Sequence, residues 1–432
     1  MAGVTVTPRF DGLERLTRAE DAPLPPVRMV HLGLGAFHRA HQAWYTSVVD
    51  VHDEWGIAGF TGRSPKVADE LAAQGGVFTL IERSAEADTL SVVGSIVEAR
   101  DGADIDRLCA LMARSEVAVV TLTITESGYA AEADSDPRTS VLGRFAIALN
   151  ARRLAGLGAL AVVSCDNLSH NGDVTRAAVD AIAGGIDPAL PEWIDQTISF
   201  VSTSVDRITP RATEADIDLV GKQTGRLDRA VVVAEPFSDW ILSGDFPAGR
   251  PRWENAGAQF VDDIAPFERR KLWLLNGAHS LLAYVGRLAG HSTVSGAFAD
   301  PIVNALVNDY WDLAAMHLPE VGLDVAGYRR QLGERFSNPR ISHQLDQIAQ
   351  DGIHKLRERI VPVIERQRSA GAPATAAWRA VAALGEHVNM PTAELLAELC
   401  PSWAGDDGVA DEFESARANL LVRLRPSFPP LH

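Results

Sequence analysis

In the first part of the chain, apolar residues gather in short runs that end at glycine or at polar residues. Runs of about four to eight such residues are typical of buried strands, and helical patterns lie between several of them. This alternation predicts an α/β domain whose largely parallel, doubly wound sheet is covered on both faces. The predicted strands are residues 27–32, 55–60, 92–96, 117–123, 160–164, 197–201 and 230–234, and the predicted helices include residues 42–51, 103–114, 139–157 and 173–183.

From about residue 252 the pattern becomes helical only, after a Pro- and Gly-containing stretch at residues 244–251 that we interpret as a linker. We therefore predict a Rossmann-type dinucleotide-binding domain over residues 27–250 and an all-α domain over residues 251–432. A cleft between two such domains is a natural ligand site. The predicted helices of the second domain are residues 267–288, 302–316, 325–335, 341–370, 376–387, 392–399 and 411–423.

The first predicted strand runs directly into Gly33-Leu-Gly35-Ala36-Phe37, so a strand, a glycine turn and a helix follow one another. In a dinucleotide-binding domain the first glycine allows the tight turn, and the second lets the backbone approach a pyrophosphate. The turn is therefore a candidate binding site for NAD or NADP. Its spacing is a variant of the full glycine fingerprint, and an ordinary turn at a strand end is the alternative.

The ribose of the cofactor's adenosine is expected at the end of the second strand. An acidic residue there would bond the 2′-hydroxyl group and repel a 2′-phosphate. This chain has Arg63 and Ser64 at that position, and both could bind the phosphate. Arg63 could equally be a loop cation, so the sequence leaves the choice between NAD and NADP open.

Polar residues follow several predicted strands at their carboxyl ends, where doubly wound sheets bind ligands. Glu126 follows the strand at 117–123, Asn167 follows the strand at 160–164, and Asp206 comes shortly after the strand at 197–201. These three are candidate site residues by position. Each could instead cap a helix, and Asp166 or Asn167 is well suited to that role.

Residues 271–279 set Lys271, Asn276 and His279 among large apolar residues in a predicted α-helix. At about 100° per residue, Asn276 lies roughly 140° and His279 roughly 80° around the helix from Lys271, so the three share one broad face. A lysine drawn partly into apolar surroundings has a lowered pKa and can exchange a proton near neutral pH. The alternative is a solvated charge run at residues 268–271 beside an ordinary core histidine.

Charge and cysteine content restrict the partners. The formal net charge of −17 argues against a nucleic-acid backbone or an anionic membrane. The three cysteines are too few and too scattered for a disulfide framework, and His38 and His41 lack a third ligand at useful spacing, so we predict no metal site. Neither a signal peptide nor an apolar run of about 20 residues is found. We expect a cytoplasmic protein with a small-molecule partner.

Several stretches together resemble the long-chain mannitol dehydrogenase family of polyol and uronate dehydrogenases. They follow one another in family order between about residues 27 and 360. A set of this size is far more specific than any one motif. The stretches are HLGLGAFHRAH (31–41), TLTITESGY (121–129), SCDN (164–167), VDRITP (205–210), AEPF (234–237), KLWLLNGAH (271–279) and RFSNP (335–339).

The resemblance implies a metal-independent, NAD(P)-linked oxidoreductase that transfers hydride between nicotinamide and a secondary-alcohol carbon. It implies that Lys271 is the general acid/base, that Asn167 and Asn276 polarise the reacting carbonyl, and that His279 positions the substrate with support from Asp206. The chemistry of these residues agrees. Hydride arriving at a carbonyl builds negative charge on oxygen, which amide donors stabilise and a lysine can protonate.

Within the family, residues 343–359 resemble members that reduce the keto-uronate D-fructuronate to D-mannonate. Members that oxidise mannitol have an arginine where this chain has Gln347. A carboxylate-bearing substrate needs a cation, and Lys355 and Arg359 lie four apart on the predicted helix, hence on one face. Gln347 would lie roughly 80° from Lys355 around the same helix and could bond a sugar hydroxyl.

Three alternatives remain open from the sequence. The substrate could be a neutral polyol such as mannitol or arabinitol, with the cations at 355–359 forming a solvated basic patch. The chain could also be a nucleotide-binding scaffold that keeps the fold without the reaction. Arg357 replaces the family's usual proline, so the local structure around Lys355 and Arg359 could differ from that of the family.

Overall fold

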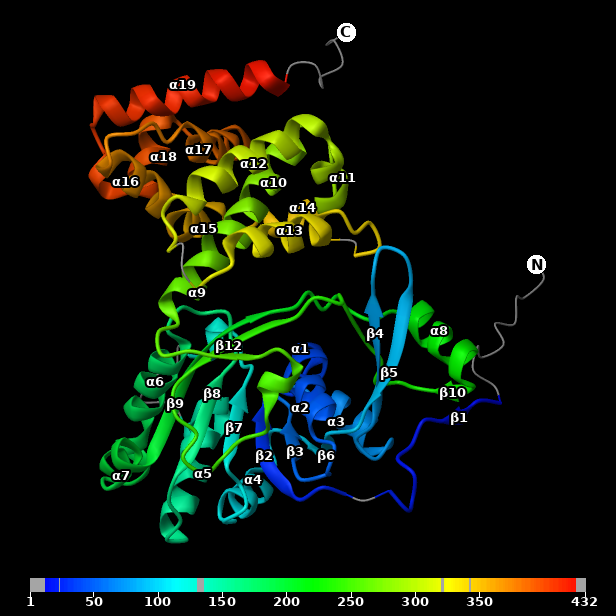
Figure 1. Ribbon diagram of the computed structural model, residues 1–432. Coiled ribbons are helices and arrows are strands. Elements are labelled where there is room, and N and C mark those ends of the chain that lie inside the picture. Colours follow the sequence, from blue (N-terminus) through cyan, green and yellow to red (C-terminus); the bar gives the residue numbers. More distant parts are fainter. Residues whose placement is uncertain (1–11, 23, 130–135, 320–321, 342, 425–432) are drawn as a thin grey trace, which may run out of the picture. The chain divides into compact units, whose positions relative to one another are not determined.

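The computed structural model describes residues 12–22, 24–129, 136–319, 322–341 and 343–424 (Figure 1). The chain divides into two compact units, unit 1 up to Ile264 and unit 2 from Ala265. The division comes later than the boundary predicted after residue 250. The reason is that β13 (Gln259–Phe260), which follows the predicted linker, pairs with β12 (Asp239–Ser243) of unit 1.

Unit 1 is built on a sheet with the order β13-β12-β9-β8-β7-β2-β3-β6 in the part of the chain that the structure describes. The strands from β9 to β6 are parallel, and the chain order of these strands reverses between β2 and β7. This is the doubly wound topology that the sequence predicts, and ligands bind where the order reverses. The parallel strands are β2 (Val27–Leu32), β3 (Gly56–Phe60), β6 (Ile96–Arg100), β7 (Val119–Leu122), β8 (Leu160–Ser164) and β9 (Ile198–Asp206).

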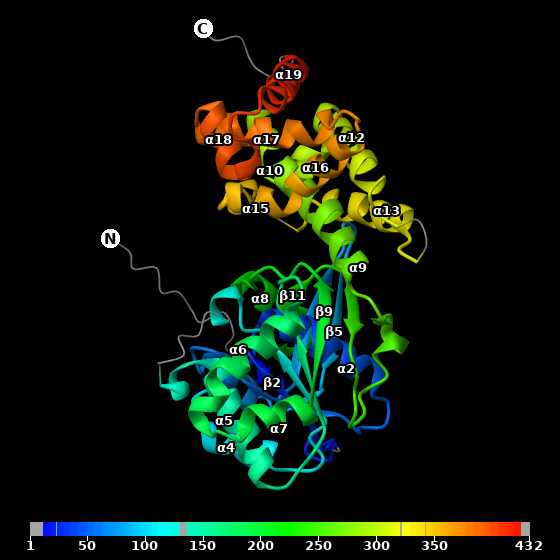
Figure 2. The same cartoon turned by 90° about the vertical axis from the view of Figure 1, so that its left-hand side faces the viewer.

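Both faces of this sheet are buried, because alternate strand residues enter two different cores. Met29 and Ile57 pack with η1 (Arg39–Ala43), α2 (Trp44–Val49) and α3 (Lys66–Ala72). Val30 and Ala58 pack with the helices of the opposite face, which lie together on one side of the sheet in Figure 2. Burial on both faces explains the unbroken apolar runs of these strands. The helices of the second face are α4 (Ile105–Met112), α5 (Val141–Leu154), α6 (Asn171–Ile186) and α7 (Leu190–Thr197).

The strand predicted at residues 92–96 is wrong, because those residues span the end of one strand and the start of another. They join β5 (Asp88–Val93) to β6, which belongs to the main sheet. β5 instead forms a hairpin with β4 (Phe78–Arg83), and β4 is parallel to β11 (Val232–Ala234). Most of β5 is only partly buried, so it lacks the apolar run that marks the strands of the main sheet.

Unit 2 is helical in its described residues. Its central helix is α10 (Gly277–Leu288), in which residues 277–286 are all buried. Helices α11, α12, α14, α15 and α17 contact it, which explains why it is buried on every side (Figure 1). The other helices are α9 (Ala265–Arg270), η5 (Lys271–Asn276), α11 (Val294–Ala299), α12 (Pro301–Ala315), α13 (Val325–Phe336), α14 (Leu345–Ile348), α15 (Gly352–Arg359), α16 (Val361–Ser369), α17 (Thr375–Val388), α18 (Thr392–Leu399) and α19 (Asp407–Leu424).

The single helix predicted over residues 341–370 is wrong, because the chain forms α14, α15 and α16 there. Asp351 has a φ of 56° and turns the chain before α15 begins. Gly352 follows because a Cβ at that position would lie 2.4 Å from the hydroxyl oxygen of Tyr284. Gln347 and Lys355 therefore lie on different helices, and the face that we predicted they share does not exist.

None of the helices within the described ranges combines the length and the hydropathy that crossing a bilayer requires.

Candidate functional site

The glycine turn after β2 lies where the strand order of the main sheet reverses. Gly33 has a φ of +104°, and a Cβ on it would lie 2.0 Å from the carbonyl oxygen of Thr123, so no side chain fits. The N–H groups of Gly33 and Leu34 both donate to the carbonyl of Phe60 at 2.9 Å. The helix then begins with Gly35 as its N-cap and with Ala36 and Phe37 in its first turn, α1 (Ala36–His38).

The helix continues as a π-helix over η1, and a buried arginine bonds one of its carbonyls. Arg207 donates to the carbonyl of Ala40 at 2.6 Å and to the carbonyl of Glu235 at 3.0 Å, and it is ion-paired with Glu82. Burial lowers the pKa of Arg207. The residue therefore links the helix after the glycine turn, β4 and the end of β9, where Asp206 lies buried.

Asp166 holds the turn after β7 and does not cap a helix. Its carboxylate oxygens accept from the N–H of Ile124 at 3.0 Å and of Thr125 at 2.8 Å, and from the hydroxyl of Tyr129 at 2.7 Å. Burial raises the pKa of Asp166 in spite of these donors. Helix α6 begins five residues later with His170 as its N-cap, so the capping alternative for Asp166 and Asn167 is wrong.

The turn that Asp166 holds is strained. Thr125 has a φ of 69° and a ψ of 158°, a conformation that β-branched residues rarely adopt and that costs on the order of 1–3 kcal/mol. Strain of this kind persists only where surrounding bonds impose it. Glu126 follows directly and is exposed, as is Asn167 after Asp166.

At the end of β3, Arg63 and Ser64 lie exposed in the loop that leads to α3. The hydroxyl of Ser64 accepts from the N–H of Lys66 at 3.4 Å, near the start of that helix. Both residues are therefore at the carboxyl end of the strand next to β2, as the sequence predicts.

In unit 2 the chain winds as a π-helix from Lys271 to Asn276, so the α-helical angles that we predicted for this stretch are wrong. A π-turn bonds residues five apart, which brings Lys271 and Asn276 closer to one face than an α-helix would. π-turns occur frequently at functional sites. Lys271 and Asn276 are both half-buried, and His279 on the following turn is buried.

Two side chains of α12 bond carbonyls of this π-turn. The hydroxyl of Tyr310 donates to the carbonyl of Trp273 at 3.0 Å, and the indole of Trp311 donates to the carbonyl of Leu274 at 2.8 Å. A Cβ at Gly277 would lie 2.2 Å from the Tyr310 hydroxyl oxygen, so glycine after Asn276 is what allows this approach. The glycine after Asn276 therefore lets α12 pack closely on this turn, and that packing fixes the backbone from which the Asn276 side chain extends.

His279 is not the satisfied core histidine of the alternative interpretation. Its ring lies 5.2 Å from the ring of His343 at 83°, and 4.9 Å from that of Phe336. Its Nε2 is buried and has no hydrogen-bond partner among the described residues. Burial lowers its pKa well below the usual value, and the nearby His343, Arg335 and Arg359 lower it further. His279 is therefore a neutral imidazole near the guanidinium groups of Arg335 and Arg359.

Arg359 lies beside this helix. Its Nη1 donates to the hydroxyl of Ser280 at 3.2 Å and lies 3.5 Å from the carbonyl oxygen of Asn276. Lys355 donates instead to the carbonyl of Ile348 at 3.1 Å, at the end of α14. Exposed Arg357, which stands where the family usually has proline, bonds the main-chain carbonyl and the carboxylate of Glu398. Gln347 is exposed on α14.

The sequence interpretation missed Arg335 and His343 as neighbours of His279. Arg335 belongs to the RFSNP stretch and His343 begins the stretch at 343–359, but no spacing connects either with residue 279. His343 is held by its backbone, since its carbonyl accepts from the N–H of Val294 at 3.0 Å and the next residue bridges to Thr293. Only the folded chain brings them together.

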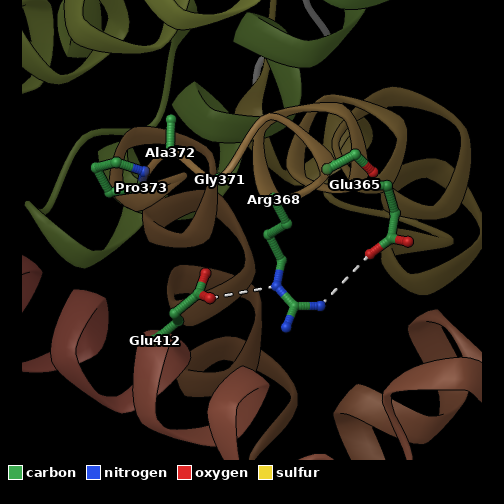
Figure 3. Close-up of a pocket in the computed structure, with 7 residues that line it drawn as sticks. Glu365, Arg368, Gly371, Ala372, Pro373 and Glu412 are labelled. Atoms are coloured by element: carbon green, nitrogen blue, oxygen red, sulfur yellow. Dashed lines mark hydrogen bonds and ion pairs between the residues drawn. The ribbon is translucent and has the colours of Figure 1, made fainter.

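The charged residues that line a surface pocket of unit 2 hold helices together, and none of the candidate site residues lines that pocket (Figure 3). Arg368 bonds Glu412 at 3.2 Å and lies 3.9 Å from Glu365. Each glutamate also accepts from an indole, Glu365 from Trp403 at 2.6 Å and Glu412 from Trp378 at 2.9 Å. The network joins α16, α17, α19 and the short 3-10 helix η6 (Pro401–Trp403). No group of three or more His, Cys, Asp or Glu side chains that could hold a metal ion occurs within the described ranges.

Comparison with known proteins gives a consistent result. The family described as mannitol dehydrogenase Rossmann domain matches residues 27–255, and the mannitol dehydrogenase C-terminal domain matches residues 263–393. D-mannonate oxidoreductase of Escherichia coli (strain K12) is 38% identical over 385 residues, which are 82% of this chain and 78% of that protein. Mannitol 2-dehydrogenase of Aspergillus fumigatus is 36% identical over 370 residues, 78% of this chain and 73% of that protein.

Two solved structures share the fold over nearly the whole chain. The Pseudomonas fluorescens mannitol 2-dehydrogenase ternary complex with NAD and D-mannitol has a TM-score of 0.79 at 32% identity, and the match covers 93% of this chain and 94% of that one. D-sorbitol dehydrogenase in substrate-free form has a TM-score of 0.85 at 27% identity, with coverages of 96% and 98%.

Proposed function

The chain belongs to the mannitol dehydrogenase family of oxidoreductases, and on that premise we propose that it is an NAD(P)-dependent enzyme that reduces a keto-uronate, D-fructuronate to D-mannonate. The observation that carries the substrate class is the contact of Arg359 with Ser280, which keeps a guanidinium beside the helix of Asn276 and His279. A cation there favours a substrate with a carboxylate. Oxidation of mannitol or arabinitol is the second candidate, which the mannitol 2-dehydrogenases among the relatives support.

The glycine turn fits a dinucleotide. Gly33 has no room for a side chain, and the turn stands where the strand order reverses. Gly33, Gly35, Ala36 and Phe37 would hold the pyrophosphate, with Arg63 and Ser64 near the adenosine ribose. When bound, the nicotinamide cofactor supplies the hydride.

The remaining proposed roles belong to this chain's polar residues. Lys271 gives a proton to the carbonyl oxygen during reduction and takes it back in the reverse direction. The amides of Asn167 and Asn276 donate to that oxygen as its charge grows. His279, which burial keeps neutral, orients a hydroxyl, while Asp206 supports the site and Glu126 contacts the substrate. The presence of all these residue types in one chain argues against the non-catalytic scaffold.

For the substrate, Arg359→Ala should lower kcat/KM for fructuronate by roughly 30- to 100-fold while changing that for fructose much less, because the lost bond is charge-assisted. Lys355→Met should cause a smaller selective loss, about tenfold, because Lys355 also bonds the carbonyl of Ile348. Steady-state kinetics with both sugars measures this.

Arg357→Ala is the matched control for these two variants. It removes a cation from the same helix, but an exposed one that bonds Glu398, and should leave both substrates within about twofold of wild type. Equal or better use of fructose than of fructuronate by the wild type, or equal losses on both sugars in Arg359→Ala, would contradict the carboxylate assignment and favour the polyol alternative.

For the cofactor, we expect NADP(H) to be accepted. An acidic residue in the loop after β3 would repel the 2′-phosphate, but this chain has Arg63 and Ser64 there. Arg63→Ala should lower kcat/KM for NADPH about tenfold and leave that for NADH nearly unchanged. Kinetics with each cofactor at saturating substrate decides. A strong preference for NADH that Arg63→Ala leaves untouched means that Arg63 is only a loop cation.

A further inference from the structure

A fully buried histidine lies beneath the glycine turn, at the point where the strand order reverses. His31 is on β2 and pairs in register with Thr121 on β7. Its Nδ1 lies 2.8 Å from the hydroxyl oxygen of Thr121, and its Nε2 lies 3.1 Å from that of Thr123. The hydroxyl of Thr123 in turn donates to the carbonyl of Gly33 at 2.9 Å. Three hydrogen bonds in a row therefore connect β7 with the turn.

The chemistry of the end groups assigns every proton in this chain of bonds. A carbonyl oxygen only accepts, so the single hydroxyl hydrogen of Thr123 is committed to Gly33. The bond between Thr123 and His31 then requires an N–H on Nε2 of the imidazole. Nδ1 carries no proton and accepts from the hydroxyl of Thr121. The donors all point one way, from Thr121 to Gly33.

The charge state of His31 agrees with this assignment. Burial lowers the pKa of His31 to about 3, so the imidazole is neutral around pH 7 and carries one N–H. Hydrogen bonds with the backbone of Gly33 and Thr121 raise the pKa of the ring, but burial outweighs them. The ring of His38 stacks on His31 at 3.4 Å and keeps it in place.

The anchored carbonyl lies at the centre of the turn. The Gly33 oxygen lies 3.5 Å from the position that a Cβ of Gly35 would take, so the two glycines of the turn are close neighbours in space. On the other side, the carbonyl of Phe60 holds the N–H groups of Gly33 and Leu34. The turn is thus tied to β3 by its N–H groups and to β7 by its carbonyl. Thr123 alone could rotate its hydroxyl, and the N–H of His31 removes that freedom.

We propose that His31, acting through Thr123, is a positioning residue for the cofactor-binding turn. By fixing the Gly33 carbonyl it holds the turn in its binding conformation before the dinucleotide arrives, so less conformational freedom is lost on binding. The inference rests on the proposed function, since the ligand is the dinucleotide of that function. His31 has no contact with the ligand in this role.

Thr123→Val is the direct test, because it keeps the branched shape and removes only the hydroxyl. It should raise the Kd for NADH or NADPH about tenfold, since the Gly33 carbonyl and the His31 N–H lose their partner. Turnover at saturating cofactor should change by less than about twofold. Thr123→Ser keeps the hydroxyl and should restore the wild-type Kd. Calorimetric titration of the full chain measures Kd without turnover.

Thr46→Val is the matched control. Thr46 is fully buried, whereas Thr123 is partly buried, but its hydroxyl likewise donates to a main-chain carbonyl, that of Gln42 at 2.8 Å. It also accepts from the indole of Trp253 at 3.1 Å. Its loss should lower the melting temperature but leave Kd unchanged. A Thr123→Val variant that behaves in the same way, less stable with an unchanged Kd, overturns the positioning role and leaves the bond purely structural.

The tautomer can be tested without any cofactor. In protein labelled with ¹⁵N at histidine, the signals absent from His31→Leu identify His31, and its Nε2 should carry the proton around pH 7. A proton on Nδ1 overturns the assigned direction of the bonds and with it the proposal. If the wild type binds neither dinucleotide, the proposed function itself fails, whereas a change in tautomer alone leaves that function standing.

Discussion

Lys271→Ala should lower turnover by roughly 10²–10⁴ while the Kd for the cofactor stays nearly unchanged, because the general acid of the proposed reduction is lost. Lys271 is half-buried at the first position of the π-turn, and Asn276 lies at its other end. Its place on unit 2 separates it in sequence from the glycine turn of unit 1. Steady-state kinetics for kcat and calorimetric titration for Kd give the two readouts.

Lys271→Arg separates proton transfer from charge. Arginine keeps the positive charge, but it does not lose a proton in the range where enzymes work. If Lys271 is the acid/base, this variant should lose nearly as much turnover as the alanine variant. Recovery of most turnover by arginine would mean that the residue acts only through its charge. Near wild-type turnover of Lys271→Ala across neutral pH would contradict the assignment altogether.

The doubly wound sheet could be predicted because its central parallel strands β2, β3, β7 and β8 are buried on both faces. Such a strand is a continuous apolar run, visible without knowledge of its neighbours. β5 could not be found in this way, since most of it is only partly buried and its partner β4 determines where it ends. The same holds for the breaks around α15, where Gly352 is required by Tyr284 on α10, a residue distant in sequence.

The relative placement of candidate residues could be predicted where they are close in sequence. Lys271, Asn276 and His279 share one short stretch, so their spacing alone places them on one helix. The π-turn within that stretch was not predictable, because it depends on Tyr310 and Trp311 reaching its carbonyls from α12. No helical period encodes such a contact.

Residues that join the site only through tertiary contacts were missed or misjudged. Arg335 and His343 approach His279 from separate segments, and Gln347 was placed on a helix that the chain breaks. Asp166 was weighed as a helix cap, since a short polar side chain between a strand and a helix usually is one. Its actual partners are the N–H groups of Ile124 and Thr125, just after the neighbouring strand β7. The sequence does not show that these two strand ends lie side by side.

Asn276→Ala should lower kcat by roughly 10²–10³ and change KM little, because the amide is proposed to donate to an oxygen whose charge grows only in the transition state. Tyr310 bonds the main chain of the π-turn, and Gly277 makes room for it, so the turn itself does not depend on the amide. The melting temperature should therefore stay close to that of the wild type.

Asn276→Asp tests the direction of this hydrogen bond. Aspartate has nearly the same shape, but its carboxylate accepts where the amide donates, so it should repel the developing oxyanion and lose at least as much turnover as alanine. Asn308→Ala is the matched control, because the Asn308 amide on α12 bonds Asn304 within its own helix, and its removal should leave kcat unchanged. A higher KM with unchanged kcat in Asn276→Ala would mean that the amide binds the ground state and the transition state equally, which would remove Asn276 from the catalytic step.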